Sequence, residues 1–162
     1  MEKTSVKTLT NRQDCSDAVQ HLISTADRYV AIFSQQLEPV LYNIPIVCDQ
    51  LSQLARKNRI SQVRIIAQQT RSAAADGHCL IHLAQKLSSY VQIRTPNTPE
   101  LQRFTQSWLI IDDHSICEIS NPERYQGTLI EHDRMHVSSQ LEFFDEAWEN
   151  SVPDVNTRRL HI

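Results

Sequence analysis

Segments with helical spacing alternate with short apolar segments, and this alternation limits the possible folds more than any other feature of the chain. Within residues 14–26, apolar side chains recur every third or fourth position, as on one face of an amphipathic helix. The next segment, 28–33, is short, β-branched and aromatic, which predicts a buried strand. The pattern repeats, with helices expected over 44–57 and 71–87 and strands over 63–67 and 90–93.

The last third of the chain changes to a meander of strands closed by a helix. A strand over 104–111, a turn at Asp112 and Asp113, and a return strand over 115–119 predict a hairpin. A further strand is expected over 127–130 and a helix over 137–150. The whole order predicts an α/β fold: a mixed β-sheet flanked by helices, with right-handed crossovers between parallel strands.

At 162 residues the chain is expected to form one domain. The predicted boundaries are a flexible N-terminus over 1–12, the α/β domain over 13–152 and a C-terminal tail over 153–162. Two cations and two apolar residues in the tail (Arg158, Arg159, Leu160 and Ile162) suggest docking. The surface it docks on is either this chain's own body or a partner.

Composition excludes several functional classes. The two glycines, Gly77 and Gly127, are too far apart to build a glycine-rich phosphate loop or a nucleophile elbow. A net charge of −3 argues against non-specific coating of nucleic acid. No apolar run reaches membrane-spanning length and the N-terminus has no signal-peptide core, so no membrane association is expected. Four dispersed cysteines predict buried, reduced thiols in a cytoplasmic protein.

The hairpin carries a recognisable constellation. Segment 104–113 runs as an apolar strand into Asp112 and Asp113, Ser120 and Asn121 follow, and Phe144 and Trp148 lie four apart on the last helix. These features resemble one half of the phospholipase D superfamily, whose hairpin carries the motif H-x-K-x4-D. The resemblance covers most of 28–151 and implies a phospholipase D-like half, with a site where two halves meet.

Superposing the motif on the hairpin places its histidine on Thr105, its lysine on Ser107 and its aspartate on Asp112. The resemblance then implies that phosphodiesterase chemistry is lost. Thr105 cannot form the phospho-enzyme that the imidazole forms, and Ser107 has no charge to hold a phosphate. Asp112 has no histidine to orient and is expected to cap the turn.

A second resemblance extends further along the chain. Segments 33–42, 77–80 and 158–162 are similar to an uncharacterised bacterial family of phospholipase D-like domains, which stand alone or are fused behind an acetyltransferase domain. Residues 1–27 are too few to hold an acetyltransferase, and no glycine-bearing loop is present for acetyl-CoA. This resemblance implies a fold and a context but no activity.

Ligand-binding candidates are Arg71, His78, Thr105, Ser107 and Asp112. Arg71 follows a strand end where parallel α/β folds bind ligands, and His78 lies near it. Two histidine pairs have i, i+4 spacing (His78 with His82, His132 with His136). Each pair could offer two imidazoles to a metal, although surface or capping roles are more common. No metal and no cofactor is predicted.

Three hypotheses for function remain open. The first is a non-catalytic binding or regulatory module for a nucleic acid or phosphorylated ligand, in which the exposed face of the half binds a second copy or another partner. The second is a protein-interaction subunit that works with an acetyltransferase or a larger complex. The third is a divergent phosphodiesterase with a substitute imidazole. His114 cannot serve there because a strand of about seven residues, roughly 23 Å, separates it from Thr105, whereas His132 and His136 remain candidates.

Overall fold

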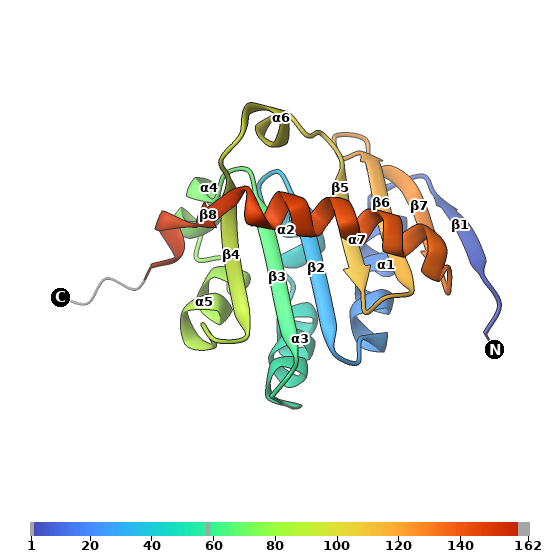
Figure 1. Ribbon diagram of the computed structural model, residues 1–162, viewed down its shortest axis with the longest axis horizontal. Helices are drawn as coiled ribbons and strands as arrows, with labels where there is room; N and C mark the ends of the chain where they lie inside the picture. Colours follow the sequence, from blue (N-terminus) through green and yellow to red (C-terminus); the bar gives the residue numbers. More distant parts are fainter. Residues whose placement is uncertain (1, 58, 159–162) are drawn as a thin grey trace.

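The computed structural model describes residues 2–57 and 59–158. They form a single eight-stranded sheet in the order β1-β7-β6-β5-β2-β3-β4-β8 (Figure 1). The strands are β1 Ser5–Leu9, β2 Tyr29–Ser34, β3 Gln62–Ala67, β4 Val91–Pro96, β5 Ser107–Ile111, β6 Ser115–Asn121, β7 Gln126–Glu131 and β8 Ser151–Pro153. The predicted mixed α/β sheet is confirmed.

The sheet has a parallel centre and antiparallel flanks. Strands β2, β3 and β4 run parallel, so their carboxyl ends meet at one edge of the sheet. Strand β5 joins β2 antiparallel, which brings the start of β5 to that same edge. The hairpin β5–β6 and strands β7 and β1 extend one flank, and β8 closes the other.

Helices cover both faces of the sheet, as Figure 1 shows. The main helices on one face are α1 Arg12–Thr25, α3 Pro45–Lys57 and α5 Cys79–Lys86. The other face is crossed by α7 Arg134–Glu149. Three short helices lie in loops: α2 Pro39–Tyr42, α4 Arg71–Ala75 and α6 Pro99–Gln102. A 3₁₀ turn, η1 Val155–Thr157, follows β8.

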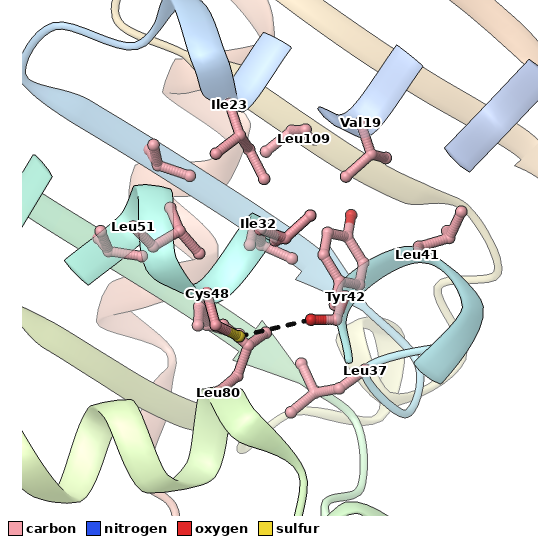
Figure 2. Close-up of a cluster of buried hydrophobic side chains, with 14 of the residues drawn as sticks. Val19, Ile23, Ile32, Leu37, Leu41, Tyr42, Cys48, Leu51, Leu80 and Leu109 are labelled. Carbon is pink, nitrogen blue, oxygen red and sulfur yellow. Dashed lines mark hydrogen bonds between the residues drawn. The ribbon is translucent and has the colours of Figure 1, made fainter. Parts of the chain in front are cut away.

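Strand alternation divides the core into two layers. In β2, Val30 and Ile32 belong to the cluster under α1 and α3, whereas Ala31 and Phe33 belong to the cluster under α7. All four are fully buried. Figure 2 shows Ile32 among side chains from α1, α2 and α3. A strand covered on both faces is apolar throughout, which explains why 28–33 was recognisable in the sequence.

Two predicted segments need correction. Residues 71–87 form two helices because Gly77 adopts φ +66°, a left-handed conformation that ends α4. His78 then caps α5, its side chain accepting a hydrogen bond from the N–H of Leu80. The N-terminal segment expected to be flexible contains β1, which pairs with β7. Its mostly exposed sequence, which includes Lys7, suits a strand at the edge of the sheet.

The cysteines divide into two kinds, which corrects the expectation of four reduced thiols. Cys48 in α3 and Cys79 in α5 form a disulfide. Cys15 and Cys117 are free and buried. Burial raises the pKa of the Cys15 thiol to about 11 and raises that of Cys117 further, so both remain protonated at neutral pH.

The C-terminal tail docks on its own body over the part that the structure describes. Asp154 is buried, and its Oδ1 accepts hydrogen bonds from Thr70 and Thr95 at 2.7 and 2.9 Å. The remaining tail residues named above, Arg159, Leu160 and Ile162, lie outside the described residues.

Candidate binding edge of the sheet

The polar residues that follow β2 and β3 and precede β5 lie together, and we call this region the carboxyl edge. It comprises 34–38, 68–71 and 104–107. Backbone hydrogen bonds from Gln68 to Ser34 and from Gln69 to Gln35 join the first two segments. Ligands of parallel α/β folds bind at such an edge because the chain leaves the sheet there and exposes polar groups.

Two glutamines fix the chain that carries Thr105. The side-chain amide of Gln68 donates to the carbonyl oxygens of Leu101, at 3.0 Å, and of Phe104. The amide of Gln35 donates to the carbonyl of Thr105 at 3.4 Å. Thr105 itself is exposed just before β5. The edge therefore presents a hydroxyl group at this position, on a backbone held by neighbouring strands.

Ser107 belongs to a buried polar cluster rather than to the surface. It is only 1% exposed, and its hydroxyl lies beside Tyr42 without forming a hydrogen bond within the described residues. Ser34 Oγ donates to Glu38 Oε2 at 2.5 Å and accepts from the N–H of Leu37 at 2.8 Å. Burial raises the pKa of Tyr42 well above its ordinary value, and the nearby Glu38 adds to the shift.

Arg71 and His78 differ in whether their side chains can reach a ligand. Arg71 is exposed, and in the described part of the chain its guanidinium forms no ion pair. His78 is 1% exposed: its Nδ1 accepts from the N–H of Leu80 at 3.1 Å, so Nε2 donates to the carbonyl of Leu37 at 2.9 Å. Both ring nitrogens are occupied, and burial lowers the pKa of His78, which keeps the ring neutral.

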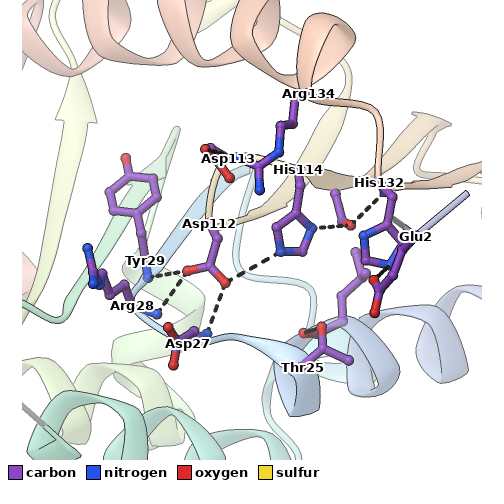
Figure 3. Close-up of polar contacts among 12 residues, drawn as sticks. Glu2, Thr25, Asp27, Arg28, Tyr29, Asp112, Asp113, His114, His132 and Arg134 are labelled. Carbon is purple, nitrogen blue, oxygen red and sulfur yellow. Dashed lines mark hydrogen bonds and ion pairs between the residues drawn. The ribbon is translucent and has the colours of Figure 1, made fainter. Parts of the chain in front are cut away.

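Asp112 lies at the opposite end of β5 from Thr105 and Ser107. The five residues of β5 put about 17 Å between the two ends. The Asp112 carboxylate accepts hydrogen bonds from the backbone N–H groups of Asp27, Arg28 and Tyr29 at 2.8–2.9 Å (Figure 3). It thus fastens the hairpin to the start of β2, and the structure does not bring it into one site with Arg71, Thr105 and Ser107.

The histidine pairs do not converge. His132 pairs with Glu2 at 2.5 Å and stacks on His114 near the Asp112 end, as Figure 3 shows. His136 pairs with Glu118 on the face that α7 covers, whereas His78 is buried near Leu37. Across 2–57 and 59–158, no group of three or more His, Cys, Asp or Glu is arranged to hold a metal ion.

Comparisons with known proteins assign the chain to a family. Residues 11–160 match the family described as Domain of unknown function (DUF7931). The chain belongs to this family. A comparison with the curated proteins finds no match.

Solved structures show the fold. Nuc of Salmonella typhimurium, a phospholipase D family member, has a TM-score of 0.69 at 14% identity, covering 94% of this chain and 99% of that one. NucT of Helicobacter pylori has 0.64 at 16%, with coverage of 94% and 99%. TrmBL2, an archaeal chromatin protein with a novel mode of DNA binding, has 0.66 at 14%, with coverage of 94% of this chain and 54% of that one. The phospholipase D-like fold predicted from the hairpin is confirmed.

Several residues in or next to the carboxyl edge escaped the sequence analysis. Glu38, Tyr42 and Gln68 occupy loops or a short helix with no periodic pattern, so only their positions after strand ends could have indicated them. A sequence cannot show that a loop glutamate, Glu38, is 5% exposed.

None of the helices in the described chain is long and apolar enough to cross a lipid bilayer.

Proposed function

We propose that this chain is a non-catalytic binding module built on the phospholipase D fold. The observation that carries the proposal is the chemistry at the start of β5, where Thr105 is exposed and Ser107 is buried beside Tyr42. Phosphodiester cleavage in this fold needs an imidazole nucleophile and a cation at these positions. Two hydroxyl groups supply neither, and the occupied ring of His78 is no substitute.

The ligand we propose for the carboxyl edge is a phosphorylated molecule, with nucleic acid as the first class to test. Arg71 is an exposed cation at this edge that forms no ion pair with the residues that the structure describes, and TrmBL2 shows that a protein of similar fold binds DNA. The outer surface of α7 is less suitable because its exposed acids would repel phosphates. These acids are Glu142, Asp145, Glu146 and Glu149.

The test separates catalysis from binding. Purified chain is incubated with a chromogenic phosphodiester, and its affinity for fluorescent single- and double-stranded oligonucleotides is measured by anisotropy at several salt concentrations. We expect no hydrolysis above buffer, and binding that weakens as salt increases. Arg71→Gln should weaken binding, whereas Arg134→Gln, which removes the same charge at the Asp112 end, should not. Hydrolysis that persists in the Thr105→Ala and Ser107→Ala variants and is abolished by His132→Gln would contradict the non-catalytic proposal and assign the substitute imidazole to His132.

A protein partner is the second candidate, and Phe143 favours it. This side chain on α7 is 38% exposed and lies against Phe104 at the carboxyl edge, with ring centroids 5.2 Å apart. An exposed aromatic anchor is a common feature of protein interfaces. Absence of oligonucleotide binding, together with a dimer in size-exclusion chromatography that Phe143→Ser dissociates, would replace the nucleic-acid proposal with self-association.

A further inference from the structure

The Cys48–Cys79 disulfide lies against the segment that follows the first part of the carboxyl edge. Its two sulfur atoms lie 3.6 and 3.5 Å from the carbonyl oxygen of Tyr42, the last residue of α2, and Figure 2 shows the Cys48 contact. The backbone N–H of Cys79 donates to Asn43 Oδ1 at 3.0 Å. The bond therefore holds the start of α5 to the end of α2, in addition to joining α3 and α5.

Both segments held by the disulfide continue into the carboxyl edge. Residues 34–38 of the edge run directly into α2, and His78, next to Cys79, donates from Nε2 to the carbonyl of Leu37 at 2.9 Å. On the other side, Arg71 begins α4, which a single turn joins to α5. A covalent bond between these segments restricts the conformations of both, because each is tied close to its junction with the edge.

The site can hold the two cysteines reduced as well as oxidised. Reduction gives each sulfur a hydrogen, and the carbonyl oxygen of Tyr42 lies close enough to both sulfurs to accept from their thiols. Cys48 is 8% exposed and Cys79 is half-buried, surroundings in which a reduced cysteine packs well. A disulfide whose two thiols would find an acceptor in place is suited to reversible opening in the folded chain.

We propose that Cys48 and Cys79 form a redox switch, operated by a low-molecular-weight thiol, that regulates binding at the carboxyl edge. This inference rests on the ligand binding proposed above for that edge. The oxidised chain holds Leu37 and Arg71 in their observed positions and binds the ligand tightly. The reduced chain leaves the start of α5 held by hydrogen bonds alone, so ordering Arg71 for the ligand costs more conformational entropy and binding weakens.

The exchange chemistry is balanced. The thiolate of one reductant molecule attacks Sγ of Cys79, the more exposed cysteine, the Cys48–Cys79 bond breaks, and Cys48 leaves as a thiolate that takes up a proton. A second reductant thiol attacks the mixed disulfide, which releases the Cys79 thiol and the disulfide of the reductant. The protein disulfide gains two electrons and two protons, and the two reductant thiols lose them.

The first measurement tests the switch without any ligand. The full chain is equilibrated with reduced and oxidised glutathione in varied ratio. Its thiol content is read by alkylation and mass spectrometry, and circular dichroism follows the fold. We expect the disulfide to open and to form again while the chain stays folded. A disulfide that reacts only after denaturant is added is purely structural, and this result overturns the proposal.

Hydrogen exchange locates the part of the chain that responds. On reduction, the amides of Asn43 and His78, which are hydrogen-bonded in the structure, should exchange faster. The amides of Asp112 and His114, at the other end of β5, report how much the loss of overall stability alone accelerates exchange. We expect the acceleration near the disulfide to exceed theirs at least about tenfold. Equal acceleration at both places means that the disulfide only stabilises the whole fold, and overturns the proposal.

Anisotropy with the fluorescent oligonucleotides connects the switch to the edge. The oxidised chain should bind at least about threefold more tightly than the reduced chain. Cys48→Ser/Cys79→Ser should bind weakly whatever the glutathione ratio. Cys15→Ser is the control: it removes a free thiol, keeps a donor for the carbonyl of Tyr125 and should leave the redox response intact.

The binding result separates this inference from the proposed function. Equal affinity of the oxidised and reduced chains overturns the regulation of the edge, even where oligonucleotides bind. Absence of binding in both states contradicts the proposed ligand instead, and the opening of the disulfide is then decided by thiol content and hydrogen exchange alone.

Discussion

The two ends of β5 differ in what their polar side chains contact. At one end, Asp112 accepts three backbone hydrogen bonds and holds the hairpin to β2. At the other, Thr105 is exposed and Ser107 is buried with an unpaired hydroxyl in the described chain. Of the three motif positions that the phospholipase D resemblance assigns, the one matched here, Asp112, joins two strands through its carboxylate, whereas the two that differ carry hydroxyl groups.

A disulfide joins two helices, α3 and α5, behind the carboxyl edge, whereas the Asp112 end is held by hydrogen bonds. The Cys48–Cys79 disulfide links α3 to α5 across 31 residues of chain. Loop closure of this length is worth about 3.5 kcal/mol of unfolding free energy. We expect Cys48→Ser/Cys79→Ser, or reduction of the wild type, to lower the unfolding free energy by about that amount in urea titrations.

Reductant provides the control for the disulfide. The double serine variant should not respond to added dithiothreitol, whereas the wild type should lose stability and show two more titratable thiols after denaturation. A wild type that yields four free thiols without reductant would contradict the disulfide.

At the Asp112 end of β5, removing the Asp112 carboxylate should lower the free energy of unfolding more than any other substitution. Asp112→Ala leaves three N–H groups without their acceptor, and we expect a loss of about 2–3 kcal/mol. The neighbouring Asp113 is exposed and makes one surface ion pair with Arg134, so Asp113→Ala should change stability by less than about 0.5 kcal/mol. Equal losses for the two variants, measured by urea unfolding, would mean that Asp112 has no special role.

His78 makes the carboxyl edge sensitive to pH. Burial lowers the pKa of His78 below 6.5 in the folded chain, so the unfolded chain binds its proton more readily. The stability that neutral His78 contributes to the folded chain is fully present above pH 6.5. It is lost as the pH falls from 6.5 towards the lower pKa of His78 in the folded chain.

Substitution isolates that contribution from those of the other histidines. His78→Gln should cost about 1 kcal/mol at pH 7.5 by removing the helix cap, and the difference from wild type should narrow as the pH approaches 5. Urea unfolding of both proteins across this range measures the difference. A gap that widens on acidification would show that His78 is charged in the fold.

The smallest change in unfolding free energy is expected at Ser107, at the end of β5 opposite to Asp112. Ser107→Ala removes a buried hydroxyl with no partner in the described chain, so stability should stay within about 0.5 kcal/mol or increase. Ser34→Ala is the matched comparison, because this hydroxyl bonds both Glu38 and the backbone of Leu37 and should cost about 1–2 kcal/mol. A loss at Ser107 as large as at Ser34 would reveal a hydrogen bond to Tyr42.

Much of the fold was predictable because buried strands and amphipathic helices leave periodic patterns. Strands β2, β3 and β4 and helices α1, α3 and α7 were found within a few residues of their observed bounds. The break at Gly77 was missed because helical spacing continues across it, and only its positive φ ends α4. Strand β1 was missed because an exposed edge strand has no apolar pattern: its first four residues are exposed.

The sequence by itself determined the class of fold and the hairpin, since both follow from local residue order, and its resemblance to the phospholipase D motif predicted hydroxyl side chains, Thr105 and Ser107, at the histidine and lysine positions. Only the tertiary structure decided which of the other residues meet. It separated Asp112 from Arg71, joined Cys48 to Cys79, gave both nitrogens of His78 a partner and buried Asp154 against Thr70 and Thr95. Each of these outcomes depends on contacts between residues far apart in the chain, which local periodicity does not encode.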